Sequence, residues 1–252
     1  ALTTNADGAF VFDDRPNITE NPAVTGFDPA RLQSWGEAAF GSPARFRPLP
    51  YLSFALQWKL SGNDPFGYHV VSDLLHALAA LALLALLFEF LRSHGPDRLP
   101  DHWRAPLAAA GALLWALHPA QTQAVTYIVQ RMTVLAGLFS FAALRLYLVG
   151  RRTGKIRPYA LAGLSYLLAL ASKESAATLP AVAILYEWFF PRDEPPKARR
   201  IRWSLLILAL LPPLLLAGAY AQASHQHFAL GRLPGRDFTL WDRMLSAPRA
   251  YG

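Results

Sequence analysis

The sequence of 252 residues contains no cysteine and few charged residues. The absence of cysteine excludes structural disulfides, thiolate zinc sites and a cysteine nucleophile, and it leaves the redox compartment undetermined. Only 16% of the residues are charged and 53% are hydrophobic, a more apolar composition than that of a typical soluble domain. This composition favours a membrane protein.

The formal net charge of +7 does not indicate a nucleic-acid partner. The basic residues form short clusters between apolar stretches and never follow one continuous face, which a nucleic-acid surface requires. The sequence also has no signal-peptide pattern and does not begin with methionine. We therefore expect it to be part of a longer chain.

Recurring hydrophobic stretches predict an all-α fold, a polytopic membrane helix bundle. Residues 72–91 are almost continuously apolar, and about 20 residues rising ~1.5 Å each span a hydrocarbon core of ~30 Å. The 13-residue stretches among the others are too short to span unless their flanks extend them. The further candidates, which bring the total to about six segments, are 105–117, 122–149, 159–171, 176–190 and 203–222.

The basic clusters predict the orientation of these segments. Residues 92–104, 151–157 and 192–202 carry half of the 24 Lys and Arg side chains, and short loops of this kind stay in the cytoplasm. Strict alternation then puts the turns at 118–122 and 172–175 on the opposite, non-cytoplasmic side. The polar motifs of the chain are all predicted on that side.

Three parts follow from this topology. Residues 1–68 are expected to form a large, helical, non-cytoplasmic first loop, residues 69–222 the transmembrane bundle, and residues 223–252 the start of a further non-cytoplasmic loop. The first loop contains amphipathic stretches at 29–40 and 48–60. The stripe of Leu52, Leu56 and Leu60 in the second stretch fits a helix in the membrane interface, and it fits an ordinary packing face equally well.

Two adjacent acids, Asp13 and Asp14, follow the apolar run Phe10–Phe12 in the first loop. A carboxylate pair can divide the work of accepting a proton and holding a substrate hydroxyl, although aspartates also start turns without any chemistry. The neighbouring aromatic residues are expected to hold this acidic loop against the membrane.

A second polar cluster is the stretch "LHPAQTQAVTYIVQRM" at 117–132. Gln123, Tyr127, Gln130 and Arg131 have spacings near three and four, so we expect them to share one face of a helix. An arginine this deep in an apolar helix normally faces a cavity, a partner charge or an anionic ligand. The alternative is a purely structural ion pair or a side chain that reaches the interface.

Lys173 and Glu174 in "SKESAATLP" provide a third cluster, either as a structural ion pair or with Lys173 on a phosphate. His69, Asp73 and His76 are spaced for a metal site on one helical face, or for hydrogen bonds to the loop. Near the basic loops, Glu89 and Glu187 are expected to reach the polar interface.

Several of these stretches together resemble one family. They are "FVFDD", "RPLPYLSFALQWKLSGNDPFGYHVVSDLLH", "LHPAQTQAVTYIVQRMTVLAGLF" and "SKESAATLP". Residues 10–190 are similar to multi-spanning membrane proteins with carboxy-terminal tetratricopeptide repeats that act as, or are assigned as, protein O-mannosyltransferases. The resemblance implies a class C (GT-C) glycosyltransferase architecture and a polyprenyl-phosphate sugar as donor. It also implies spanning helices before residue 1 and after residue 252, and the repeats beyond them.

The resemblance also implies roles for individual residues. Asp13 and Asp14 match the acidic motif of the first loop, with one of them the general base for a protein Ser or Thr hydroxyl. Family members often have glutamate where this chain has Gln123, so an acid or base role at that position is doubtful. The chemistry of transfer, apart from the resemblance, requires positive charge for the departing phosphate, and Arg131 and Lys173, helped by His118, are expected to supply it. Gln123, Tyr127 and Glu174 are expected to contact the substrates.

The expected function is therefore transfer of a sugar, in this family mannose, to protein acceptors. It would take place at the non-cytoplasmic face of a bilayer, either the periplasmic side of a bacterial inner membrane or the lumen of the endoplasmic reticulum. Whether a divalent cation, Mg²⁺ or Mn²⁺, bridges the acids and the phosphate is left open. Transport of an anionic or lipid-linked substrate and a noncatalytic anchor for a repeat scaffold are the alternatives.

Overall fold

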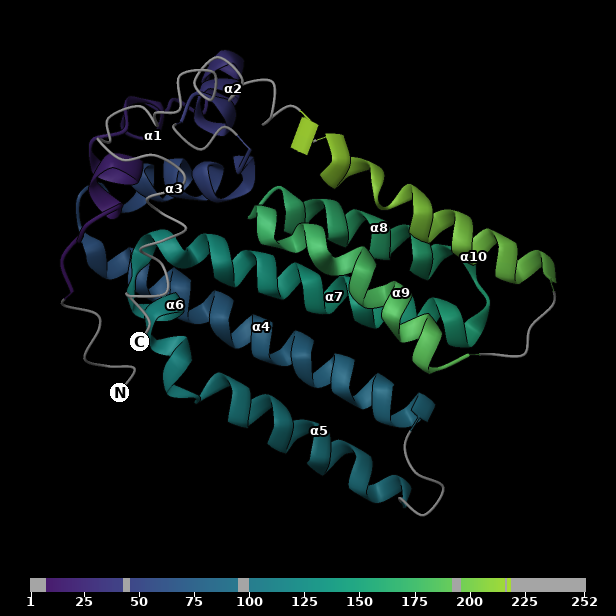
Figure 1. Cartoon of the computed structure of the whole chain (residues 1–252). Coiled ribbons are helices and arrows are strands. Elements are labelled where there is room, and N and C mark those ends of the chain that lie inside the picture. The colour runs from purple at the N-terminus through teal and green to yellow at the C-terminus, as the bar shows by residue number, and fades with distance from the viewer. Residues whose placement is uncertain (1–7, 43–45, 95–99, 192–195, 216, 219–252) are drawn as a thin grey trace, which may run out of the picture. The chain divides into compact units, whose positions relative to one another are not determined.

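The structure, a computed structural model, describes residues 8–42, 46–94, 100–191, 196–215 and 217–218. Within these ranges every regular element is helical, which confirms the predicted all-α class (Figure 1). The helices, with short π or 3-10 turns marked η, are η1 (Arg15–Thr19), α1 (Pro22–Thr25), α2 (Leu32–Phe40), α3 (Pro48–Ser61), α4 (Pro65–His94), α5 (Asp101–Ala116), η2 (Pro119–Gln121), α6 (Thr122–Thr126), η3 (Ile128–Gln130), α7 (Arg131–Thr153), α8 (Ile156–Leu170), η4 (Glu174–Thr178), α9 (Leu179–Phe189) and α10 (Pro196–Leu208).

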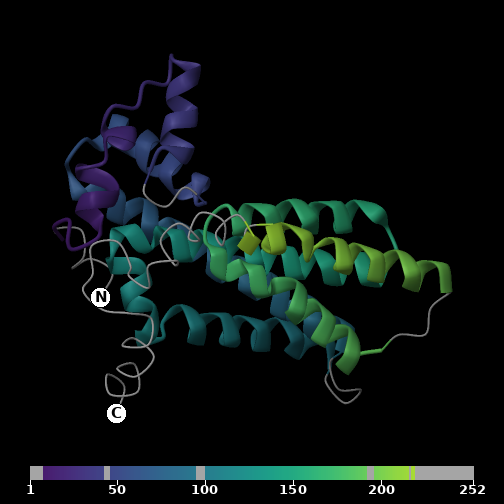
Figure 2. The same cartoon turned by 45° about the horizontal axis from the view of Figure 1, so that its top comes forward.

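The described part of residues 1–68, which the sequence predicts as a first loop and which keeps that name here, contains short helices at one end of the long helices (Figure 2). The helices η1, α1, α2 and α3 pack on one another, with Phe27, Ala38 and Ala55 buried between them. Proline stands at the first position of α1 and of α3, where its missing N–H costs no hydrogen bond. Gly62, with φ of 54°, ends α3 in a conformation that side chains rarely adopt.

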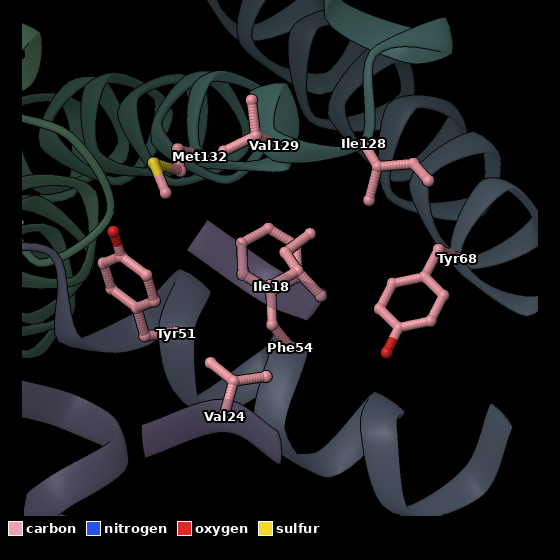
Figure 3. Packing of buried hydrophobic residues seen from close by; sticks show 8 residues of the cluster. All are labelled: Ile18, Val24, Tyr51, Phe54, Tyr68, Ile128, Val129 and Met132. Atoms are coloured by element: carbon pink, nitrogen blue, oxygen red, sulfur yellow. The ribbon is translucent and has the colours of Figure 1, made fainter. Parts of the chain in front are cut away.

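The leucine stripe of α3 is divided. Leu52 packs against the buried Phe27, Ala38 and Ala55, whereas Leu56 is 42% exposed and Leu60 is 84% exposed. Both interpretations of the stripe, a helix in the membrane interface and a packing face, therefore stay predictions. A core of eight buried side chains, shown in Figure 3, joins α3 and η1 to the first turn of α4 and to the start of α7.

Two helices are long and apolar enough to cross a membrane, by length and composition. They are α4, with 30 residues, and the 26 residues Ile128–Thr153, which comprise η3 and α7. Helix α4 begins at Pro65, where the side chain of Asp64 accepts a hydrogen bond of 3.1 Å from the Phe66 N–H. The α7 helix packs along both α4 and α8, and α5 packs along α4 (Figure 1).

The other predicted hydrophobic segments are shorter than a full span. Helix α5 has 16 residues, α8 has 15 and α9 has 11, each below the roughly 17–25 that a transmembrane helix needs. Of the about six segments expected, two therefore reach spanning length in the described part of the chain. The other helices end at turns that contain polar residues.

At the end of the long helices away from the first loop, two glutamates are buried, so the expectation that Glu89 and Glu187 reach the interface is wrong. Glu187 lies 3.0 Å from Arg151 Nε and 3.0 Å from Arg202 Nη2. Glu89 pairs with Arg152. Each carboxylate has an arginine partner inside the protein, and this pairing offsets the cost of removing the carboxylate from water.

The chain divides into two units after Leu206, and the second begins at Ile207. Its described residues are 207–215 and 217–218, helical at 211–215 and 217–218. The loop predicted at 223–252 lies outside the described residues.

Candidate functional site

Asp14 is buried and binds two backbone N–H groups, one in the acidic loop and one in the bundle. Its Oδ2 accepts a hydrogen bond of 3.0 Å from the Val11 N–H, and its Oδ1 accepts one of 2.7 Å from the Val129 N–H. Only 1% of the residue is exposed. Burial raises the pKa of this carboxyl above its ordinary value, and the two backbone hydrogen bonds and the charge of His69 oppose the rise. Asp14 thus fixes the loop onto the bundle.

Asp13 has the opposite surroundings. It is exposed, and its backbone N–H donates a hydrogen bond of 2.8 Å to the hydroxyl of Tyr127. Its carbonyl oxygen accepts a hydrogen bond of 2.7 Å from the Asn17 side chain. Both backbone groups are therefore held, while the residue lies where a substrate can reach its carboxylate. The two acids, equivalent in the sequence, differ in what they can do.

The aromatic residues before the acids have different surroundings. Phe10 makes an edge contact with the Tyr68 ring, at 5.2 Å between ring centroids. Phe12, by contrast, is 85% exposed and has a φ of 43°, which non-glycine residues rarely adopt. Phe10 therefore adds a packing contact between the loop and the bundle, and the expected contact of the run with the membrane stays a prediction.

The helix predicted through Gln123, Tyr127, Gln130 and Arg131 is broken, so the shared face is wrong. Helix α6 ends at Thr126, and Tyr127 is extended, with φ of −93° and ψ of 108°. Helix α7 begins only at Arg131. The sequence Thr-Tyr-Ile-Val across the break consists of β-branched and aromatic residues, which lose rotamer freedom in a helix.

Arg131 is fully buried behind this break, with 0% exposure. Its guanidinium donates to the Tyr68 carbonyl at 3.1 Å and to the Ser53 and Ser72 hydroxyls at 3.4 Å. It also lies 4.9 Å from the centroid of the Phe54 ring. Arg131 therefore ties α3 and α4 to the first turn of α7, and direct contact with a phosphate would require a rearrangement.

Lys173 is half-buried beside the same turn. Its ammonium group donates to the Thr133 hydroxyl at 2.7 Å and to the Gln130 side-chain oxygen at 3.4 Å. Burial lowers the pKa of Lys173, the charge of Arg47 lowers it further, and Glu174 raises it. Glu174, which is exposed, accepts two hydrogen bonds from Arg47, and these lower the pKa of its carboxyl.

Seven consecutive residues, 127–133, bring these groups together, and we call them the junction segment. Tyr127 contacts Asp13, and Val129 contacts Asp14. Gln130 and Thr133 contact Lys173. Met132 Sδ accepts a hydrogen bond of 3.2 Å from Arg47. An exposed carboxylate, an ammonium group and a guanidinium group are thus positioned by one short stretch of chain.

His118 and Gln123 are exposed and are not joined to this constellation by any hydrogen bond in the described residues. His118 Nδ1 accepts a hydrogen bond of 3.1 Å from the Ala120 N–H and so caps η2. Gln123 lies on α6, before the break. The sequence places both near the junction segment, and the structure gives them no shared partner with Asp13 or Lys173 within the ranges it describes.

The structure offers no metal-binding cluster within its described ranges, since no three His, Asp or Glu side chains there come together. His69 Nε2 donates to the Gly8 carbonyl at 3.3 Å, and His76 Nε2 donates to the Ala116 carbonyl at 3.0 Å. In the described residues, His69 Nδ1 and Asp73 Oδ1 are buried without a hydrogen-bond partner.

Sequence reasoning did not find Arg47, Ser53, Ser72 or Thr133. Each lies in a stretch that carries the family resemblance, but none was singled out, because each acquires a partner 40 or more positions away in the chain. The only local signal is the "RPLP" stretch around Arg47, which starts α3 and therefore fixes the arginine at a helix end. Its partner could not be found from spacing.

Comparison with known proteins gives named relatives. The chain is 36% identical over 188 residues to the Drosophila melanogaster protein named Protein O-mannosyl-transferase Tmtc1, covering 70% of this chain. It is 34% identical over 200 residues to the human Protein O-mannosyl-transferase TMTC1, covering 72% of this chain. It is 32% identical over 224 residues to the Drosophila Protein O-mannosyl-transferase Tmtc2, covering 83% of this chain.

The matched regions cover only part of these relatives. They amount to 20%, 21% and 23% of the three proteins, so the chain spans less than a quarter of their length. No family model and no solved structure matches the chain.

Proposed function

Because the chain belongs to the family of the TMTC protein O-mannosyl-transferases, we propose that it contains the transfer site of a membrane mannosyltransferase. The donor is a polyprenyl-phosphate sugar, and the acceptor is a serine or threonine hydroxyl of a protein. Transfer takes place at the non-cytoplasmic face of a polytopic GT-C helix bundle. The observation that carries the proposal is the junction segment, which positions an acid and two cations together.

Asp13 is the general base in this proposal. Its carboxylate accepts the proton of the acceptor hydroxyl as the oxygen attacks the anomeric carbon and the bond from that carbon to the phosphate oxygen breaks. The electron pair of the broken bond stays on the polyprenyl phosphate. Asp13 suits the role because it is exposed and its backbone is fixed by Tyr127 and Asn17. Correct placement of a base contributes as much as its basicity.

Asp14 and Tyr127 position that base. Asp14 fixes the backbone next to Asp13. Its carboxylate accepts one hydrogen bond from Val11 within the loop and one from Val129 on the bundle. The Tyr127 hydroxyl accepts a hydrogen bond from the Asp13 N–H and so lies beside the residue that the acceptor must reach. Tyr127 therefore also serves as a substrate contact.

Lys173 stabilises the departing phosphate. Its ammonium is oriented by Gln130 and Thr133, and a cation that is already in place needs no reorganisation when negative charge develops on the leaving group. Arg131 supports this arrangement from within the core. His118, exposed on the same stretch of chain, is retained as a donor contact, and Gln123 as a substrate contact.

The proposal is tested with the full-length protein in lipid vesicles. A radiolabelled mannosyl polyprenyl phosphate is the donor, and transfer of label to an acceptor protein is compared between the wild type and Asp13→Asn. Label transferred by the wild type and lost in Asp13→Asn supports the proposal. The interrupted helix at Tyr127 beside two cations also suits an anion pathway. Donor flux across the vesicle without any transfer would therefore favour a transporter instead.

A further inference from the structure

Arg47 and Glu174 form an ion pair between the first loop and the turn after α8. Arg47 Nε donates to Glu174 Oε2 at 2.8 Å, and Arg47 Nη2 donates to Glu174 Oε1. The Arg47 side chain is 25% exposed, and that of Glu174 is 60% exposed. The two segments are also joined by a backbone hydrogen bond of 3.1 Å from the Leu49 N–H to the Ala171 carbonyl. The pair is therefore open to solvent but held in place.

This ion pair lies beside Lys173. Arg47 contacts Met132 and Lys173 contacts Thr133, so the two cations rest on adjacent residues of the junction segment. Their charges interact, because Arg47 lowers the pKa of Lys173 while Glu174 raises it. Two cations this close are stabilised by an anion, and Glu174 is the anion that this structure places there.

We propose that Arg47 is a second ligand of the polyprenyl phosphate and that Glu174 is its exchangeable counter-ion, which the phosphate displaces. This inference rests on the proposed function, since it assigns further residues to the same donor site. Glu174, predicted as a substrate contact, then acts on substrate binding by competing for Arg47.

Exchange is feasible because a phosphate offers Arg47 the same two hydrogen bonds that Glu174 accepts now. The guanidinium then replaces one bidentate, charge-assisted contact with another. The planar guanidinium binds phosphate oxygens with two parallel hydrogen bonds, a geometry that Lys173 cannot offer. Once displaced, the Glu174 carboxylate can be hydrated, because most of its surface already faces solvent.

The same exchange favours the products of transfer over the substrates. The donor is a phosphodiester with one negative charge, and the released polyprenyl phosphate is a monoester with about −1.5 to −2 charges near neutral pH. A guanidinium released from Glu174 therefore interacts more strongly with the phosphate as the sugar departs. Interactions that strengthen toward the transition state are the ones that raise the rate.

The test measures binding of polyprenyl phosphate to the full-length protein in detergent, separately from sugar transfer. Arg47→Ala should weaken binding about 10- to 100-fold, the range for a charge-assisted hydrogen-bonding group. Glu174→Gln should tighten binding by up to about fivefold, because the competing charge is gone. The matched control is Arg104→Ala. The Arg104 side chain is 25% exposed, like that of Arg47, and it pairs with the exposed Asp101. This variant should leave binding unchanged.

The results separate this inference from the proposed function. Weaker binding in Arg47→Ala together with tighter binding in Glu174→Gln supports it, whether or not the wild type transfers sugar. Equal weakening in both variants would show that the ion pair is only a structural link and would overturn it. Unchanged binding in both variants would overturn it as well. Absence of transfer by a wild-type protein that binds the phosphate in the expected pattern would instead reject the proposed function.

Discussion

Asp14 Oδ1 lies 2.7 Å from the backbone nitrogen of Val129, a residue 115 positions further along the chain. The contact joins the acidic loop to the extended stretch between α6 and α7. It is possible because Tyr127 interrupts the helix, which leaves the Val129 N–H without a helical partner of its own. The free N–H at the helix interruption therefore provides the hydrogen bond that the buried Asp14 carboxylate needs. The neighbouring Asp13 stays exposed.

Asparagine at Asp13 and at Asp14 should have different effects. Asp13→Asn removes the base and should reduce transfer about 10²- to 10⁴-fold while the protein stays folded. Asp14→Asn keeps the shape but turns an amide N–H toward a backbone N–H, which should destabilise the protein by about 1–3 kcal/mol. Transfer of labelled sugar and thermal unfolding, measured side by side, distinguish the two. Equal losses of stability in both variants would contradict the division of roles.

Removing the Tyr127 hydroxyl tests how the base is positioned. Tyr127→Phe keeps the ring and deletes the acceptor of the Asp13 N–H, a hydrogen bond that contributes about 0.5–1.5 kcal/mol. The expected result is a fall in kcat of about two- to tenfold, with the KM for the donor unchanged. Tyr159→Phe, on α8, is the matched control. A change confined to the donor KM would place Tyr127 at the phosphate instead.

The pH dependence of donor binding should report Lys173. The ammonium is protonated below its pKa and loses its charge as pH rises through it, and burial lowers that pKa. The KM for the donor should therefore begin to rise at a lower pH than it would if Lys173 had the pKa of an ordinary lysine. Glu174→Gln should move this rise to still lower pH, and Arg47→Ala should move it to higher pH. A KM profile identical in Lys173→Met and the wild type would exclude the role.

The buried ion pairs at the other end of the long helices should control stability rather than chemistry. Glu187 is 4% exposed and pairs with both Arg151 and Arg202. Glu187→Leu leaves these two guanidinium groups without their carboxylate, at a cost of about 3–5 kcal/mol. Thermal unfolding in detergent measures the loss, and the exposed Glu20→Gln is the control. An unfolding temperature of Glu187→Leu equal to that of the wild type would show that this cluster does not hold the helices together.

Much of the architecture follows from composition and periodicity. The stretch at 72–91 lies within α4, and the second helix of spanning length, Ile128–Thr153, overlaps the predicted 122–149, because a long apolar stretch favours a long helix. The residues Asp13, Tyr127, Lys173 and Glu174 were predicted on one side of the membrane. The structure links all four to the junction segment, directly or through Arg47.

The failures have a common physical cause, which is pairing across long distances in sequence. The burial of Glu89 and Glu187 depends on arginines 15 to 63 positions away. The separate roles of Asp13 and Asp14 depend on Tyr127 and Val129. Helical spacing assumes an unbroken helix, and the short β-branched run at the break gives only a weak signal against one.

In the proposed mechanism the junction segment also has the role of a spacer. Its first residue, Tyr127, contacts Asp13, and its last residues contact Arg47 and Lys173, so its length would set the separation between the proposed proton acceptor and the phosphate. One residue inserted between Tyr127 and Thr133 would turn the start of α7 by about 100° relative to the acidic loop. Both halves of the site would then remain chemically intact but out of register, and activity would be lost without the loss of any named side chain.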